Sequence, residues 1–133
     1  MPYKFNPFTG ELDITGGISS PPVSFVWNVV TTATYALVAN TGNFANRSES
    51  AVTFTLPSVS TIGDIFKISA KNANGFIISQ NANQYIQIAD VTTTTGVGGS
   101  LASSKIGDFV EIVCTVANIG FIVTNIVGNL TVV

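Results

Sequence analysis

The sequence is most informative in what it has little of. It contains no histidine, one cysteine and 9% charged residues, with a net charge of −2. Without histidine, no Ser-His-Asp or Cys-His catalytic arrangement and no imidazole metal site is available. Five basic residues are too few to form a patch that meets phosphates, so we expect no nucleic-acid partner. A single cysteine excludes an internal disulfide, and the pattern of its strand predicts that Cys114 is buried.

The seven acidic residues show no spacing typical of a catalytic or metal site. Asp64 and Asp108 each follow a glycine at equivalent places of a repeated pattern, and we interpret them as carboxylates that cap turns. The Gly-rich segment 96–100 lacks the lysine of a phosphate-binding loop. We therefore predict no catalytic residue, no metal and no cofactor, and thus no enzyme. A hydrolase that uses Asp64 and Asp108 is the alternative left open.

The scarcity of charge also bears on assembly. A monomer of 13.9 kDa exposes about 6,700 Å², over which the twelve charged side chains are spread thinly. Either neutral polar residues cover that surface, or much of it is buried between identical subunits, and we favour the second, a homotrimer. The sequence has no apolar run of the length of a signal peptide core or a membrane span, so no membrane insertion is expected.

One strand–turn–strand pattern occurs twice, in residues 62–78 and 106–123. Each copy has Gly-Asp before its first strand and Ala-Asn with a nearby glycine at its turn, and Ile119 is a one-residue insertion in the second copy. Asn and Gly accept the left-handed backbone of tight hairpin loops. The pattern therefore predicts two β-hairpins.

Further strands are predicted wherever apolar and polar residues alternate, namely in residues 25–29, 35–39, 52–56, 85–89 and 130–133. Residues 40–50 are predicted to form a polar loop. Turn residues recur about every ten positions and no segment has helical periodicity, which predicts an all-β fold. We expect an antiparallel β-sandwich or jelly roll of eight to nine strands, whose edges a trimer would cover.

Residues 1–20 are predicted to be an arm, joined to a head domain of residues 21–133. Small residues at 16–20 and the prolines at 21 and 22 mark the joint. The arm has too few apolar residues for a core of its own, so it packs either on its own domain or, as we favour, on a partner protein. Its predicted anchoring residues are Tyr3, Phe5, Pro7, Phe8 and Leu12.

Two features suit a ligand such as a glycan. Neutral amides gather at a turn next to an aromatic ring, and the residues concerned are Gln80, Asn81, Asn83, Gln84 and Tyr85. Ordinary turn chemistry is the alternative explanation of these amides. Trp27, with Tyr35 or Tyr85, would stack on sugar rings if exposed, but the alternation of its strand favours core packing for Trp27.

The residues at the start, Pro2 to Asp13, resemble a segment common at the beginning of small bacteriophage structural proteins. Residues 51–133 resemble the terminal domains of phage tail-fibre-like proteins, through the segments 56–58, 63–64, 92–100 and 128–133. This resemblance implies that the N-terminal segment attaches to the virion and that the β domain is a trimeric head that contacts the host. Coiled-coil heptads and collagen-like or β-helical shaft repeats are absent, which favours a short appendage over a long fibre.

Together these observations predict a virion protein of a bacteriophage, such as a short head fibre, decoration protein or tail-attached knob. Its expected partners are two further copies of the chain, a capsid or tail protein, and a host surface glycan as the candidate receptor. A free carbohydrate-binding β-sandwich module that uses the 80–84 turn and Tyr85 is the alternative.

Overall fold

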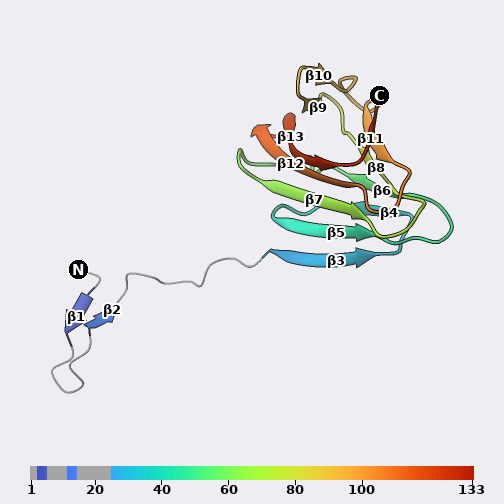
Figure 1. The fold of residues 1–133 in the computed structure, drawn as a ribbon. Coiled ribbons are helices and arrows are strands. Elements are labelled where there is room, and N and C mark those ends of the chain that lie inside the picture. The colour runs from blue at the N-terminus through green and yellow to red at the C-terminus, as the bar shows by residue number, and fades with distance from the viewer. Residues whose placement is uncertain (1–2, 6–11, 15–24) are drawn as a thin grey trace.

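The computed structural model describes residues 3–5, 12–14 and 25–133, and every regular element in these ranges is a β-strand (Figure 1). Strands β1 (Tyr3–Phe5) and β2 (Leu12–Ile14) pair antiparallel, with Phe5 opposite Leu12. The other strands form one sheet of seven and one sheet of five, which we call the two-sheet body. The all-β prediction is confirmed, but the two sheets contain more than the eight to nine strands that were expected.

The seven-stranded sheet has edge strands β10 and β3, and the five-stranded sheet has edge strands β14 and β4. In spatial order the first sheet contains β10 (Val91–Thr92), β9 (Tyr85–Ile88), β13 (Gly120–Val127), β12 (Phe109–Val116), β7 (Ile65–Ala70), β5 (Thr41–Ala45) and β3 (Val26–Val30). The second contains β14 (Thr131–Val132), β11 (Ser100–Ser103), β8 (Phe76–Ser79), β6 (Val52–Thr55) and β4 (Thr34–Ala36).

Between β3 and β8 the chain winds as a coil of three turns, each of which gives one strand to each sheet. Strands β3, β5 and β7 are parallel neighbours in the first sheet, and β4, β6 and β8 are parallel neighbours in the second. The prediction of an antiparallel sandwich or jelly roll is therefore wrong about strand direction here. Apolar residues alternate with the same period in parallel and antiparallel strands, so the pattern did not distinguish them.

The two copies of the repeated pattern fold differently. The second is the predicted hairpin, because β12 and β13 pair antiparallel and Asn118 takes a φ of 67° in the turn. The first is not a hairpin, because β7 and β8 lie in different sheets. The connection between its two strands is held by the connection between β5 and β6, because Asn74 Nδ2 donates to the carbonyls of Arg47 (3.1 Å) and Ser48 (2.9 Å). Contacts distant in sequence thus override the same local signal.

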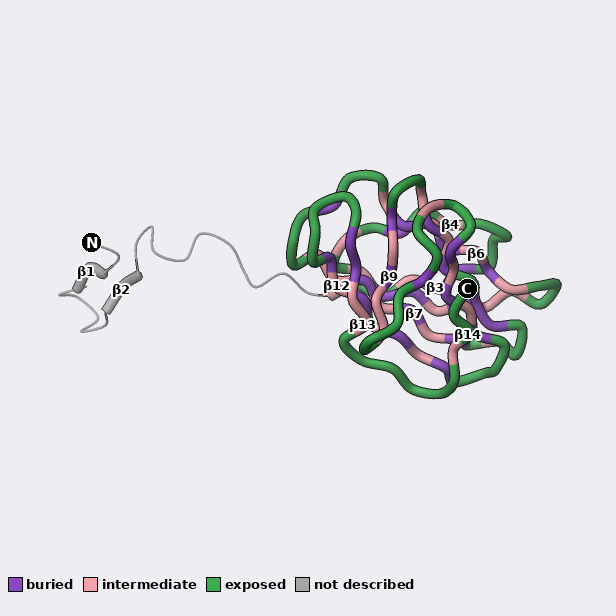
Figure 2. The backbone as a smooth tube through the Cα atoms, turned by 90° about the horizontal axis from the view of Figure 1, so that it is seen from above, coloured by how far each residue is buried: buried purple, intermediate pink, exposed green. Residues whose placement is uncertain are grey.

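Buried side chains from both sheets form a single hydrophobic core. The alternation on β7 is the expected one, with Phe66, Ile68 and Ala70 buried and the residues between them half-buried. The ring of Phe66 meets that of Phe121 edge-on at 6.0 Å. Cys114 is 1% exposed, which confirms its predicted burial. Figure 2 shows these buried stretches along the strands and the exposed loops around them.

The segment predicted as a polar loop contains a strand inside the larger sheet. Strand β5 lies between β3 and β7 and has parallel partners on both sides. Gly42 and Asn43 are both unfavourable in strands, which hid it from pattern analysis. Asn43 is fully buried, and its amide group has no hydrogen-bond partner among the described residues.

Candidate functional site

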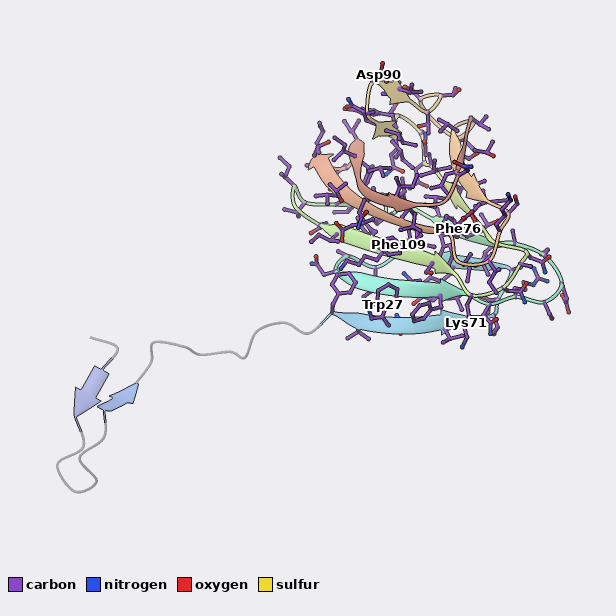
Figure 3. The ribbon with its side chains drawn as sticks, in the orientation of Figure 1. Trp27, Lys71, Phe76, Asp90 and Phe109 are labelled. Atoms are coloured by element: carbon purple, nitrogen blue, oxygen red, sulfur yellow. The ribbon has the colours of Figure 1, made fainter. Side chains whose placement is uncertain are left out.

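Trp27 lies on the outer face of the larger sheet, on the side of edge strand β3 opposite to the buried Val30 (Figure 3). It is 40% exposed, so the prediction that it packs in the core was wrong. Its indole lies over Gly42 of β5, where a Cβ atom would overlap the ring carbons. Phe44 stacks on the indole with centroids 4.6 Å apart, and Phe25 approaches it at 6.2 Å. We call Phe25, Trp27 and Phe44 the aromatic shelf.

A polar row continues from this shelf across the sheet. The strand register aligns Trp27 and Gly42 with Lys67, Glu111 and Asn125. Lys67 Nζ lies 4.5 Å from the centroid of the Phe25 ring and 3.4 Å from Glu111 Oε2. Thr124 Oγ1 donates to Glu111 Oε1 at 2.8 Å. We define this polar row as Lys67, Glu111, Thr124 and Asn125. Its net charge is zero, and the side chains of Lys67 and Glu111 are 29% and 25% exposed.

Two of the residues predicted to contact a glycan lie inside the fold. Gln80 is 3% exposed, and its Nε2 donates to the carbonyls of Gln84 (2.7 Å), Thr94 (2.9 Å) and Gly96 (2.9 Å). Thr93 Oγ1 donates to Gln80 Oε1. The side chain of Gln80 therefore ties the 93–96 loop to the 80–84 turn. Its prediction as a ligand contact is corrected, because the amide is already used by backbone carbonyls.

Gln84 is corrected for the same reason. It is 1% exposed, its Nε2 donates to the carbonyls of Pro57 (2.8 Å) and Asn118 (3.2 Å), and its Oε1 accepts from the Asn81 amide (2.8 Å). Ordinary turn chemistry, the alternative explanation, therefore describes both glutamines. One polar side chain here joins three separate loops.

The remaining members of that predicted site differ in exposure. Asn81 is half-buried and donates from Nδ2 to the Leu56 carbonyl at 2.7 Å, whereas Asn83 is exposed with a φ of 68°. Tyr85 is half-buried on β9, where its ring lies against Gly120 of the neighbouring strand. Of the five residues, only Asn83 and Tyr85 offer a surface free of such internal ties.

The predicted anchoring residues are described only in part. Tyr3 and Phe5 fall on β1 and Leu12 falls on β2, which the structure describes as paired strands. Pro7 and Phe8 lie outside the described residues. The division at residue 20 and the anchoring role both stay predictions.

The two ends of the two-sheet body differ in polarity. The proximal end, where β3 begins, carries the loops 37–40, 56–64 and 117–119, which touch one another. Ser60 N donates to Asn118 Oδ1 at 2.8 Å, and Asn40 N donates to the Ile65 carbonyl at 2.7 Å. Exposed aliphatic tips project from these loops, with exposed fractions from 41% to 77%, namely Val38, Val59, Ile62 and Ile119.

The distal end carries charged residues in the loops 46–51, 71–75 and 104–107. Arg47 pairs with Glu49 at 2.7 Å beside an open hollow of about 370 Å³. Lys71, labelled in Figure 3, and Lys105 are exposed at this end, together with the aliphatic side chains of Ile106 and of Val127 at the end of β13. Charges therefore favour water at the distal end, and aliphatic tips favour a covering surface at the proximal end.

Asp64 and Asp108, the two acidic residues of the repeated pattern, serve local structure. Asp64 Oδ2 accepts from the Thr61 amide at 2.9 Å, which confirms its interpretation as a turn cap. Asp108 is buried and accepts from Ser103 Oγ at 2.7 Å. Within residues 25–133 no group of His, Cys, Asp or Glu is arranged to hold a metal ion. The described segments also include no helix long and apolar enough to cross a membrane.

Comparison with known proteins adds no family to this description. No protein-family model matches the chain, and no curated protein matches it. Any functional proposal for this protein therefore rests on the aromatic shelf, the polar row and the difference between the two ends.

Proposed function

We propose that this protein is a structural protein of a bacteriophage virion. In this proposal it is a short appendage, a homotrimer whose β-sandwich head is fixed to the capsid or tail by residues 1–20. The observation that carries the proposal is the apolar proximal end. Strand β3 begins there, and the 24 residues that precede Phe25 therefore join the body at the end with the aliphatic tips.

The physical argument concerns orientation. Full burial of an exposed Val or Ile side chain contributes roughly 1.5–3 kcal/mol, so a partner that covers the four tips gains stability at that end. A protein that binds residues 1–14 is held close to the same end by the short segment that follows. The charged distal end then faces solvent, where a host surface is met.

Trimerisation is supported by the surface of the body. Between Phe25 and Val133, fifteen Val and Ile residues are at least 36% exposed, and the sequence has 9% charged residues. Closed symmetric assembly is a common way to cover such side chains where they lie next to one another. The alternative, a free carbohydrate-binding module centred on the 80–84 turn, loses two of its contact residues because Gln80 and Gln84 are buried.

Deletion of residues 1–15 tests the anchoring role. We expect the truncated protein to melt at the same temperature as the full chain but to be missing from purified particles. Light scattering on both proteins should give a molar mass about three times 13.9 kDa. Normal incorporation of the truncated protein, or a stable monomer in dilute solution, contradicts the proposal.

A matched pair of surface variants tests the orientation. The double substitution Val59→Ser and Ile62→Ser removes two aliphatic tips that are 77% and 67% exposed at the proximal end. The control, Ile106→Ser, removes a tip that is 66% exposed at the distal end. We expect weaker incorporation only for the proximal variant, because only that end faces the partner. Equal effects of the two variants contradict this orientation.

A further inference from the structure

We propose that the aromatic shelf and the polar row together bind a neutral saccharide. One pyranose ring stacks its C–H face on the indole of Trp27, and its hydroxyl groups bond to Lys67 and Glu111. The inference goes beyond the proposed function, because the purified protein can be tested for it without any particle. It also moves the candidate sugar site from the 80–84 turn to the outer face of the larger sheet.

The shelf is already formed in the unbound protein. The indole has Gly42 beneath it and Phe44 stacked on it with an interplanar angle of 24°, so its position is set by two strands. A ring held in this way loses little conformational entropy when a ligand covers it. Trp27 nevertheless stays 40% exposed, so part of the residue remains open to a ligand.

The polar row supplies donors and acceptors next to that surface. Lys67 lies two strands away from Trp27 in the same register, with Gly42 between them, and its ammonium group lies 4.5 Å from the centroid of the Phe25 ring, which is itself 6.2 Å from the indole. Lys67 offers donors and Glu111 offers acceptors, and their separation of 3.4 Å fixes both groups. Vicinal hydroxyl groups both donate and accept hydrogen bonds, which matches this pair.

The charge of the row selects the class of ligand. Because Lys67 and Glu111 neutralise one another, the site offers no net attraction to a sulfate, phosphate or sialic acid. A neutral sugar fits instead. A second copy of the chain is a poorer occupant, because covering the row with apolar side chains removes water from an ion pair and gives no hydrogen bond in return.

The chain has one tryptophan, so its fluorescence reports on this site alone. The full-length protein is titrated with maltohexaose, cellohexaose and chitohexaose, and with dextran sulfate as the charged probe. We expect a saturable change in emission with at least one neutral oligosaccharide and none with dextran sulfate. No saturable change with any neutral probe up to about 10 mM overturns the proposal.

Variants then locate the site by calorimetry with the oligosaccharide that binds. Trp27→Ala should weaken binding at least about tenfold, and Trp27→Phe by less, because a smaller ring remains. Glu111→Gln should also weaken it, and Val97→Ala, at a site 76% exposed in the 94–99 loop, should not. Unchanged binding by Trp27→Ala overturns the proposal. A fall in molar mass of Trp27→Ala without loss of sugar affinity also overturns it and assigns this face to a second copy of the chain.

Discussion

Replacing Gln84 by leucine tests whether the buried amide is structural. In the native protein this side chain satisfies three backbone groups from different loops, the carbonyls of Pro57 and Asn118 and the amide of Asn81. Leucine has a similar volume but no polar atom. All three groups then lose their partner at a position where the side chain is 1% exposed.

The expected loss can be estimated group by group. A buried backbone group without a partner costs about 1–3 kcal/mol. Asn118 is exposed, and Asn81 and Pro57 are half-buried, so water can partly replace the lost bonds at these groups. We therefore expect the free energy of unfolding to fall by about 3 kcal/mol in total, which for a chain of this size corresponds to roughly 10 °C in melting temperature.

Urea unfolding followed by circular dichroism measures this loss, and Gln87→Leu is the matched control. The side chain of the half-buried Gln87 makes one hydrogen bond, to the carbonyl of the exposed Ala89 at 2.9 Å. The control should lose at most about 0.5 kcal/mol. If Gln84→Leu is no less stable than Gln87→Leu, the buried amide does not hold the three loops, and the reasoning that removed it from the ligand site is refuted.

Three further predictions address other parts of the body. Gly42→Ala should displace the indole and shift its emission to longer wavelength, because the new Cβ overlaps the ring; an unchanged spectrum contradicts the shelf geometry. Cys114 should resist a thiol reagent in the native protein and react fully in denaturant, since it is 1% exposed; rapid native labelling contradicts its burial. Asn118→Gly should cost about 1 kcal/mol in urea unfolding, because Gly keeps the φ of 67° but loses the bond to the Ser60 amide; no loss shows that this bond adds nothing.

The parts of the fold that depend on local pattern were predictable. Alternation on β7 identified its buried residues, and left-handed positions at Gly63 and Gly107 match the Gly-Asp turns of the repeat. Strand partners were not predictable in the same way. The two copies of the repeat share their turn residues, yet β12 pairs with β13 whereas β7 and β8 separate into different sheets. The partner of a strand is set by contacts far away in the sequence.

The candidate site shows the same division. Amide-rich turns look like a polar surface, but Gln80 and Gln84 point their amides at carbonyls of loops that are distant in sequence. Trp27 has the alternation of a core residue, and what exposes it is its place on the outer face of the sheet, opposite to the buried Val30 of the same strand. The signal that predicts its position is the glycine it covers, and Gly42 becomes its neighbour only when the parallel register of β3 and β5 is known.

The site therefore depends on the coil. The parallel register of β3, β5 and β7 places Trp27, Gly42 and Lys67 in one row across three strands. The antiparallel β12 adds Glu111 to that row. A register shift by one residue in β5 would put Asn43 under the indole and turn Gly42 into the core. Asn43 does not oppose that shift, because its buried amide has no hydrogen-bond partner among the described residues. Buried apolar residues oppose it instead, since Ala45 packs beside Val30 and Ala70 in the core and the shift would move Ala45 to the outer face. The packing that fixes the fold thus also places the aromatic ring beside its polar partners.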